Sequence, residues 1–401
     1  MAASQSDLSP APLSGVRVLD LTHYIAGPYA TKWLATLGAD VVKVERPSTG
    51  DPLRGFGPFP PGAEGDREQG GHFLYLNTGK RSVALDLRTA EGRDAVLWMT
   101  AQSDVVVESF APGKLASFGL GYERLMEANP RVVLTSISNF GQDGPYRDVR
   151  ASEIVLFGMG GLMSLIGYDE EPPLKFGGYQ AMYMGGISAF TATMLALTRA
   201  ELGGAGSHVD VSIFEGMVSS HFQSMVQYEY TGRVQRRSRA MMVFPCSDGF
   251  AGLLVQEHQW QRLTEVLGVP ELREKRFATA LERRQNYGEL EAIMLAWSLP
   301  RTKQEIYETG QDAGLPFSFF ATVDDILASP QYVHRDFFAA VEHPVAGTYR
   351  YPGSPVRFDG RAPVSGRAPL LGEHTAEVLG ESGMSASAIA AISAISGGGG
   401  S

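Results

Sequence analysis

The chain has 401 residues, a hydrophobic content of 44% and a formal net charge of -10. This length exceeds the usual range of one hydrophobic core, so we expect two domains, or one domain with a large excursion. The acidic balance and the lack of any run of Lys and Arg argue against a nucleic-acid partner.

Cysteine usage and the N-terminal segment predict a cytoplasmic chain. Cys246 is the only cysteine, so no internal disulfide can form and a reducing compartment is indicated. The first residues lack the basic start and apolar stretch of a signal peptide, and we expect no apolar run long enough to span a bilayer. The 8 histidines are scattered without metal-ligand spacing, so no metal site is predicted.

The N-terminal third alternates strands with helices. Strands are predicted over 16–21, 41–45, 82–87, 104–110 and 132–138, and Gly38 stands where a glycine commonly ends a helix. Such an order is typical of a parallel sheet built by right-handed crossovers. We therefore predict an α/β fold with a Rossmann-like layer.

Helices are predicted next, over 153–165 and 181–202, followed by a strand over 208–215. From about residue 225 a strand over 249–255 precedes several amphipathic helices. The predicted division is a large Rossmann-like domain (1–224), a smaller α+β domain (225–325), a return segment (326–384) and a flexible, linker-like tail (385–401).

The first loop, THYIAGPYA, lies between the first strand and the first helix. Parallel α/β sheets bind ligands at this place, and a helix N-terminus favours phosphate. Neither a G-x-G-x-x-G nor a P-loop motif is present. His23 in this loop is either an acid or base, or a residue that only shapes a ligand pocket.

Four blocks of sequence point to a family. They are GVRVLDLTHYIAGPYATKWLATLGADVVKVERPSTGDPLR, FLYLNTGKRSVALDL, DVVVESFAPGKLASFGLGYE and NPRVVLTSISNFGQDGPYRD. In this order and spacing they resemble the class III CoA-transferases, or CaiB/BaiF family, which include formyl-CoA transferase and α-methylacyl-CoA racemase. The resemblance runs from about Leu13 to Glu215, and more loosely to Phe358.

The resemblance implies the fold of that family, an interlocked dimer, and a coenzyme A (CoA) thioester as substrate with no covalently bound cofactor. CoA carries phosphates, which Arg side chains bind with paired N–H groups, and an adenine that needs apolar walls. By position, the residues implied in CoA binding are His23, Ile25, Ala26, Arg46, Leu85, Asp86, Leu87, Arg88, Ser109, Phe110, Ala111 and Arg150. Ser117 stands where the family often has Arg, and Lys114 is the candidate to replace that charge.

The catalytic position departs from the family. Its transferases use an aspartate that attacks the acyl-CoA carbonyl, and in the stretch GGYQAMYMGG this position falls on Met182, whose thioether cannot form an anhydride. Glu153 is the nearby carboxylate: either a substitute nucleophile or general base, or a helix-start carboxylate that favours its own N-terminus. The stretch GRVQRRSRAMMVFPCSDG also carries basic and bulky residues where family members have a glycine-rich lid.

Three functions therefore stand open. The leading one is an acyl-CoA:carboxylate CoA-transferase, which moves CoA between a thioester and a carboxylic acid, with Glu153 doing the covalent work. The second is a non-catalytic CoA-binding subunit, paired with a paralogous chain in a heterodimer rather than a homodimer. The third, a CoA-thioester racemase or isomerase, needs an acid and a base; the histidine of the racemase is Ser152 here.

Overall fold

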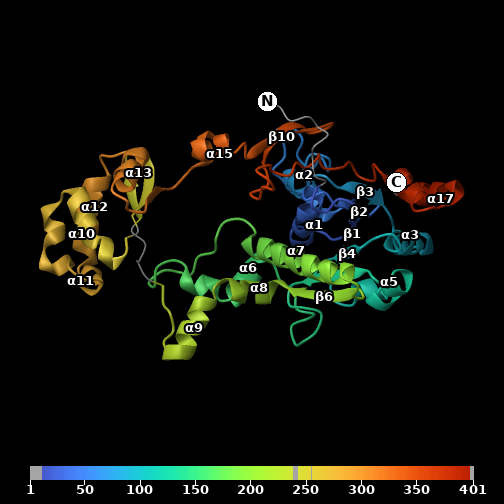
Figure 1. Ribbon diagram of the computed structural model, residues 1–401, viewed down its shortest axis with the longest axis horizontal. Coiled ribbons are helices and arrows are strands. Elements are labelled where there is room, and N and C mark those ends of the chain that lie inside the picture. Colours follow the sequence, from blue (N-terminus) through green and yellow to red (C-terminus); the bar gives the residue numbers. More distant parts are fainter. Residues whose placement is uncertain (1–10, 238–242, 254, 398–401) are drawn as a thin grey trace. The chain divides into compact units, whose positions relative to one another are not determined.

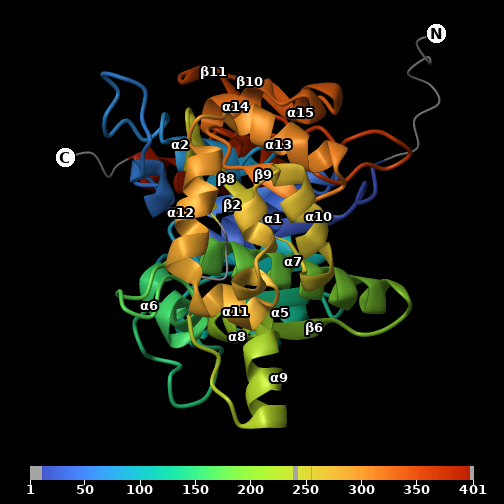
Figure 2. The same ribbon diagram turned by 90° about the vertical axis from the view of Figure 1, so that its left-hand side faces the viewer.

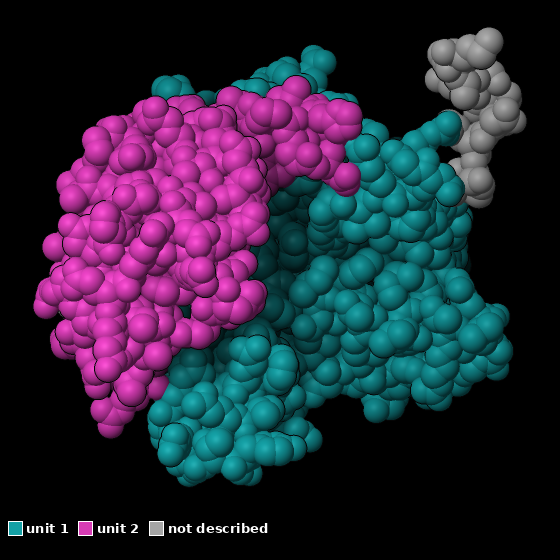
Figure 3. Space-filling view, turned by 60° about the vertical axis from the view of Figure 1, so that its left-hand side comes forward, with its two compact units in different colours: residues 1–166, 173–235, 336–401 teal, residues 167–172, 236–335 magenta. Residues whose placement is uncertain are grey.

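The computed structural model describes residues 11–237, 243–253 and 255–397 (Figure 1). The chain divides into two compact units, coloured separately in Figure 3. Unit 1 comprises residues 1–166, 173–235 and 336–401, and unit 2 comprises residues 167–172 and 236–335.

Unit 1 contains a six-stranded sheet with the order β3-β2-β1-β4-β5-β6, and every neighbouring pair is parallel. Its strands are β1 (Arg17–Leu21), β2 (Asp40–Glu45), β3 (Arg81–Ala84), β4 (Val105–Glu108), β5 (Val133–Ser138) and β6 (Ser207–Ser212). This is the doubly wound Rossmann order, so the predicted parallel layer is confirmed. Gly38 follows the first helix with φ of 100°, a left-handed conformation that suits glycine, as predicted.

Three predicted strands of unit 1 end earlier than expected, among them β4, which was predicted through residue 110 and ends at Glu108. After β3, the Asp86 carboxylate accepts from the backbone N–H of Arg88 (2.9 Å), which turns the chain toward the next helix. After β6, the Ser212 hydroxyl accepts from the backbone N–H of Glu215 (3.3 Å) and caps α8. The prediction of a strand through residue 215 was therefore wrong for residues 213–215, which are helical.

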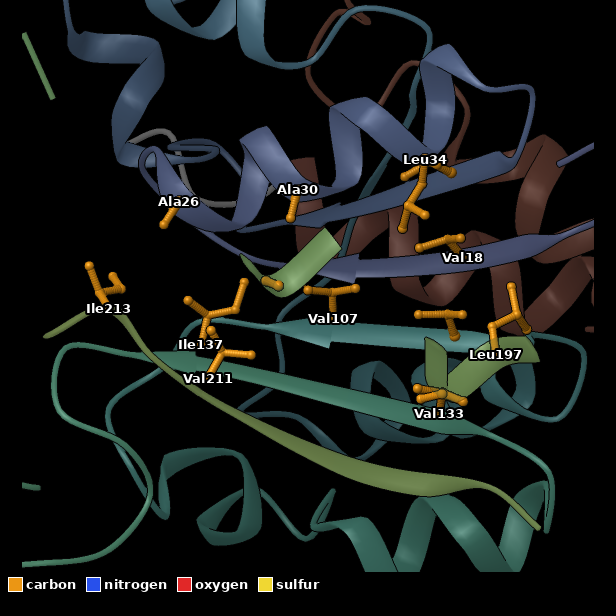
Figure 4. Packing of buried hydrophobic residues seen from close by; sticks show 14 of the residues in the cluster. Val18, Ala26, Ala30, Leu34, Val107, Val133, Ile137, Leu197, Val211 and Ile213 are labelled. Atoms are coloured by element: carbon orange, nitrogen blue, oxygen red, sulfur yellow. The ribbon is translucent and has the colours of Figure 1, made fainter. Parts of the chain in front are cut away.

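Both faces of the sheet are covered by helices. Because successive strand residues point to opposite faces, Val18, Val107 and Val133 face the core beneath α1 (Ala26–Thr36) and α7 (Gln180–Glu201), as Figure 4 shows. Leu19, Val106 and their neighbours pack on the other face against α3 (Ala90–Thr100), α5 (Tyr122–Ala128) and α16 (Thr375–Glu381).

The remaining elements of unit 1 connect or flank these layers. They are η2 (Pro52–Gly55), α2 (Gly71–Leu76), α4 (Lys114–Ser117), α6 (Glu153–Met159), η3 (Leu162–Leu165), α8 (Ile213–Ser220), α9 (Phe222–Thr231), the hairpin β10 (Phe338–His343) and β11 (Gly347–Pro352), and α17 (Ala386–Gly397). The predicted flexible tail thus includes a helix, because Ile389 and Ile392 are spaced to pack on the same side against the α3 face of the sheet.

Helix α7 corrects one expectation. Its 22 residues are long and apolar enough to cross a membrane by length and composition, although no such run was expected. In the structure α7 packs against α1, β5 and β6, with Ala189, Thr193 and Leu197 buried. One face of α7 therefore lies in the core of unit 1, whereas Ile187 and Leu195 on the same helix are exposed.

Unit 2 has an antiparallel sheet with the order β7-β8-β9, surrounded by short helices. Its core includes Trp260, Phe277 and Met294, and Cys246 is buried in β7. The elements are β7 (Val243–Cys246), β8 (Gly249–Leu253), η4 (Glu257–Gln259), α10 (Trp260–Leu267), η5 (Pro270–Arg273), η6 (Lys275–Phe277), α11 (Ala280–Gln285), α12 (Tyr287–Ser298), α13 (Lys303–Asp312), β9 (Phe317–Phe319), α14 (Val323–Ala328) and α15 (Pro330–His334).

Candidate functional site

The strand order of unit 1 reverses between β1 and β4, and ligands of doubly wound sheets bind at the carboxyl ends of the strands at such a point. A cavity of about 610 Å³ lies there. Its walls come from the ends of β1 and β2 and from the segments that follow β1 to β4. The lining residues are Leu21, His23, Val44, Glu45, Arg46, Pro47, Ser48, Thr49, Leu85, Asp86, Leu87, Arg88, Phe110, Lys114 and Phe118.

The cavity brings together most of the predicted ligand contacts. Those that line it are His23, Arg46, Leu85, Asp86, Leu87, Arg88 and Phe110. Those outside the lining are Ile25 and Ala26, buried at the start of α1, and Ser109, Ala111 and Arg150. The turn 47–49 was not predicted; its signal was its place directly after the second strand and Arg46.

Three cations surround the cavity, and all are exposed to solvent: Arg46, Arg88 and Lys114. Arg88 is paired with Asp86 (2.7 Å), and the Lys114 ammonium lies 4.4 Å from the ring centre of Phe118. Arg46 makes no ion pair with any residue that the structure describes. Because all three side chains reach solvent beside the cavity, they can bind phosphate groups there.

His23 contributes an uncharged ring. Burial, followed by the nearby Lys43 charge, lowers the pKa of His23 to about 4, so the imidazole is neutral at neutral pH. The ring lies 5.2 Å from that of Phe110, and the backbone N–H of His23 donates to the Ser109 hydroxyl (2.9 Å). The two rings, tilted by 60° to each other, form an uncharged part of the cavity wall.

A buried network of ion pairs stabilises the loop between β1 and α1. The Lys43 ammonium lies 3.0 Å from Asp51 and donates to the backbone carbonyl of Thr22 (2.8 Å), and Lys80 lies 3.0 Å from Asp20. Asp51 also accepts from the backbone N–H of Tyr24 (3.1 Å), a non-glycine residue with φ of 62°. These contacts stabilise a loop conformation that a tyrosine rarely adopts.

Glu153 and Met182 meet at the N-terminus of α7. The buried Glu153 carboxylate accepts from the backbone N–H groups of Ala181 (2.9 Å) and Met182 (3.2 Å). Both carboxylate oxygens therefore cap α7, and Glu153 is also the first residue of α6, in keeping with the helix-start alternative. Met182 is half-buried and packs against apolar residues of both flanking clusters.

Glu108, at the end of β4, is a titratable residue that sequence reasoning missed. Its side chain is 3% exposed, and burial, aided by the Asp210 charge, raises the pKa of its carboxyl to about 7. It accepts from the backbone N–H of Phe110 (2.7 Å), a residue of the cavity wall. Nothing in the local sequence indicates that a carboxylate at the end of a strand is buried to this extent.

The last two sequence predictions concern the lid segment and a metal site. Part of the stretch that replaces the glycine-rich lid, residues 238–242, lies outside the described residues. Within the described ranges, no group of three or more His, Cys, Asp or Glu side chains is placed to hold a metal ion.

Comparison with known proteins gives one consistent result. The model of CoA-transferase family III matches residues 13–375. The succinyl-CoA–D-citramalate CoA-transferase of Chloroflexus aurantiacus is 31% identical over 93% of this chain and 94% of its own length. The succinate–glutarate CoA-transferase of Agrobacterium fabrum is 33% identical over 92% of this chain and 95% of its own length. A CaiB/BaiF family protein from Brucella suis aligns with a TM-score of 0.83 and 32% identity, over 93% of this chain and 100% of that one.

Proposed function

This chain belongs to CoA-transferase family III, and we propose that it binds an acyl-CoA thioester in the cavity at the ends of β1 to β4 and passes the CoA to a carboxylic acid. The observation that carries the binding site is the cavity itself, because its cations and its uncharged aromatic wall match the two halves of the CoA nucleotide. Arg46, Arg88 and Lys114 suit the phosphates. His23 and Phe110 suit the adenine ring.

We infer that the acceptor is a dicarboxylic acid. The relatives described above are named for succinyl-CoA, D-citramalate, succinate and glutarate, all of which carry a second carboxylate or its thioester. Other relatives at 33–34% identity are named for oxalate and mesaconate, which are also dicarboxylates. A shared substrate class across these relatives supports the same class here.

For the reaction we propose direct exchange between the two substrates. A carboxylate oxygen of the acid attacks the thioester carbonyl, and a mixed anhydride forms as CoA leaves as its thiolate. The thiolate then attacks the acid-derived carbonyl, and the original acyl group departs as a carboxylate. One prediction and one observation support a route without a protein nucleophile. The sequence predicts Met182 at the family's aspartate position, and both oxygens of Glu153 accept from backbone N–H groups of α7.

The same prediction and observation favour one second candidate, a non-catalytic CoA-binding subunit whose partner chain keeps the aspartate. Racemisation has less support, since Met182 and Ser152 provide neither a base nor an acid. A dimer is proposed in either case, and a cytoplasmic location is proposed from the single cysteine.

The decisive experiment uses the purified chain with succinyl-CoA and glutarate, and mass spectrometry to detect glutaryl-CoA. We expect glutaryl-CoA from the wild type and from Glu153→Gln, and no protein hydroxamate when hydroxylamine is added. A hydroxamate at Glu153 that is lost in Glu153→Gln would show that Glu153 is the nucleophile instead.

No exchange, from a folded chain that still binds CoA, would favour the subunit reading. Met182→Asp then serves as the comparison, because it returns a carboxylate to the family's position. Activity gained only in this variant would show that the wild-type chain is inactive because it lacks the nucleophile.

A further inference from the structure

Lys32 is a buried cation without an acidic partner. The side chain is on α1, and the residue is 8% exposed. The other buried cations, Lys43, Lys80 and Arg54, each lie within 3.0 Å of a carboxylate. For Lys32 the described residues offer neither an ion pair nor a hydrogen-bond acceptor, and burial lowers the pKa of its ammonium to about 8.

The groups around Lys32 are tyrosines and a tryptophan. The Lys32 ammonium lies 4.6 Å from the ring centre of Tyr75 on α2, and 5.9 Å from that of Trp33. Tyr29, one turn earlier on α1, lies 4.8 Å from Tyr183 on α7. The ring of Tyr75 can stabilise one side of the ammonium, but a ring face accepts no conventional hydrogen bond from the three N–H groups.

Further donors in this cluster are also unused. The indole Nε1 of Trp33 is buried without a partner among the described residues. The hydroxyls of Tyr29, Tyr75 and Tyr183 likewise make no hydrogen bond within the part of the chain that the structure describes. Burial, followed by the neighbouring tyrosines, raises the pKa of Tyr75 to about 12, so its hydroxyl remains a donor. An ammonium beside several hydroxyls lacks an anionic acceptor.

The cluster adjoins the position of the missing nucleophile. Tyr183 follows Met182 directly on α7, and both residues pack with Tyr29 and Tyr75 against the same apolar core residues, which include Ile25. The backbone N–H of Tyr29 donates to the Ile25 carbonyl (2.8 Å), at the end of the first loop. All of these residues belong to unit 1.

We propose that Lys32, together with the hydroxyls of Tyr29, Tyr75 and Tyr183, binds the second carboxylate of the dicarboxylic acid and thereby determines acid specificity. The inference rests on the proposed function for the identity of the acid. A carboxylate supplies the acceptors that the ammonium and hydroxyls lack, and a charge-assisted hydrogen bond in a buried place is worth more than one at the surface. A monocarboxylic acid offers these donors no second anionic acceptor.

The test is equilibrium binding by calorimetry, with the full-length chain saturated with CoA. Glutarate is compared with pentanoate, which has the same number of carbon atoms and only one carboxylate. We expect the wild type to bind glutarate about 10- to 100-fold more tightly than pentanoate, the range that follows from one charge-assisted hydrogen-bonded contact. In Lys32→Met this preference is lost, while the pentanoate affinity is unchanged.

Tyr75→Phe keeps the ring beneath Lys32 and removes only the hydroxyl, so a smaller loss of glutarate preference is expected. Lys275→Met, at an exposed lysine of unit 2, is the matched control and keeps the preference. The inference is overturned if Lys32→Met retains the preference for glutarate. A Lys32→Met variant that changes only the midpoint of thermal unfolding overturns it as well, because Lys32 would then have a structural role alone.

Binding and transfer are read separately. A chain that fails to make glutaryl-CoA but prefers glutarate through Lys32 contradicts the transfer reaction alone. A chain that makes glutaryl-CoA with equal efficiency in wild type and Lys32→Met contradicts this inference alone.

Discussion

At the scale of single residues, Glu108 gives a pH-dependent stability. Its pKa is raised from 4.5 to about 7 because the folded protein favours the protonated carboxyl. The protonated form therefore stabilises the folded state fully below pH 4.5, and this stabilisation is lost as the pH rises through 7. Glu108→Gln removes the cost of burying this charge and should raise the free energy of unfolding at pH 8 by up to about 3 kcal/mol, with little change at pH 4.5.

Thermal unfolding followed by circular dichroism at the two pH values checks this. Glu342→Gln, at an exposed position on β10, is the control and should change neither midpoint. An equal shift for Glu108→Gln at both pH values would mean that the charge is not the cause.

The cations of the cavity give a second prediction at this scale. Arg46→Ala and Lys114→Ala should each weaken CoA binding about tenfold, because each removes a charge-assisted contact to phosphate. The loss should shrink for pantetheine, which lacks the nucleotide phosphates. Isothermal calorimetry measures both affinities.

Arg150→Ala is the comparison, because Arg150 lies outside the cavity lining. A tenfold loss in that variant would place Arg150 in contact with CoA, as the sequence predicted. Equal losses for CoA and pantetheine in Arg46→Ala would rule out a phosphate contact by Arg46.

At the scale of elements, the close approach of α7 to α1 depends on Gly186. A Cβ at this position would lie 2.6 Å from the backbone oxygen of Ala26 and 3.0 Å from Cδ1 of Tyr29. Since the backbone oxygen cannot move without displacing α1, Gly186→Ala should lower the free energy of unfolding by about 1–3 kcal/mol.

Gly380→Ala is the matched control on α16, where nothing lies within 4 Å of the added methyl group. The control should be neutral or stabilising by up to about 1 kcal/mol, because alanine favours the helix. Urea unfolding of both variants gives the comparison. A neutral Gly186→Ala would mean that the two helices are not in the close contact described here.

At the scale of the whole molecule, α9 indicates a partner chain. The helix has no buried residue, Figures 1 and 2 show it projecting from the rest of unit 1, and Phe222 and Tyr230 are 60% and 87% exposed. Exposed apolar side chains gathered on one element are typical of an interface. We expect a dimer, with twice the chain mass of 43.2 kDa, by light scattering.

Phe222→Asp combined with Tyr230→Asp should produce a monomer, because two charges would have to be buried in the interface. Leu281→Asp, at an exposed position of unit 2, is the control and should leave the mass unchanged. A wild-type chain that is monomeric at micromolar concentration would contradict the proposal.

The sequence by itself determined the features that local pattern encodes. Apolar runs predicted the parallel strands, and Gly38 ended the first helix. Ordered motifs predicted a common site for Arg46, Arg88 and Phe110, which line one cavity in the structure. The same motifs predict that Met182 stands at the family's catalytic position. Such features need only neighbours along the chain, or motif positions that keep their order, so they could be read without coordinates.

Only the tertiary structure decided what depends on distant segments. Glu153 caps a helix that begins at residue 180, the pKa of Glu108 depends on packing around the end of β4, and α7 is a core helix because α1 and the sheet cover it. Lys32 looks like a solvated lysine in the sequence. Its unpaired ammonium emerges only when α1 and α2 bring Trp33 and Tyr75 around it, because burial is a property of the packed molecule and not of local sequence.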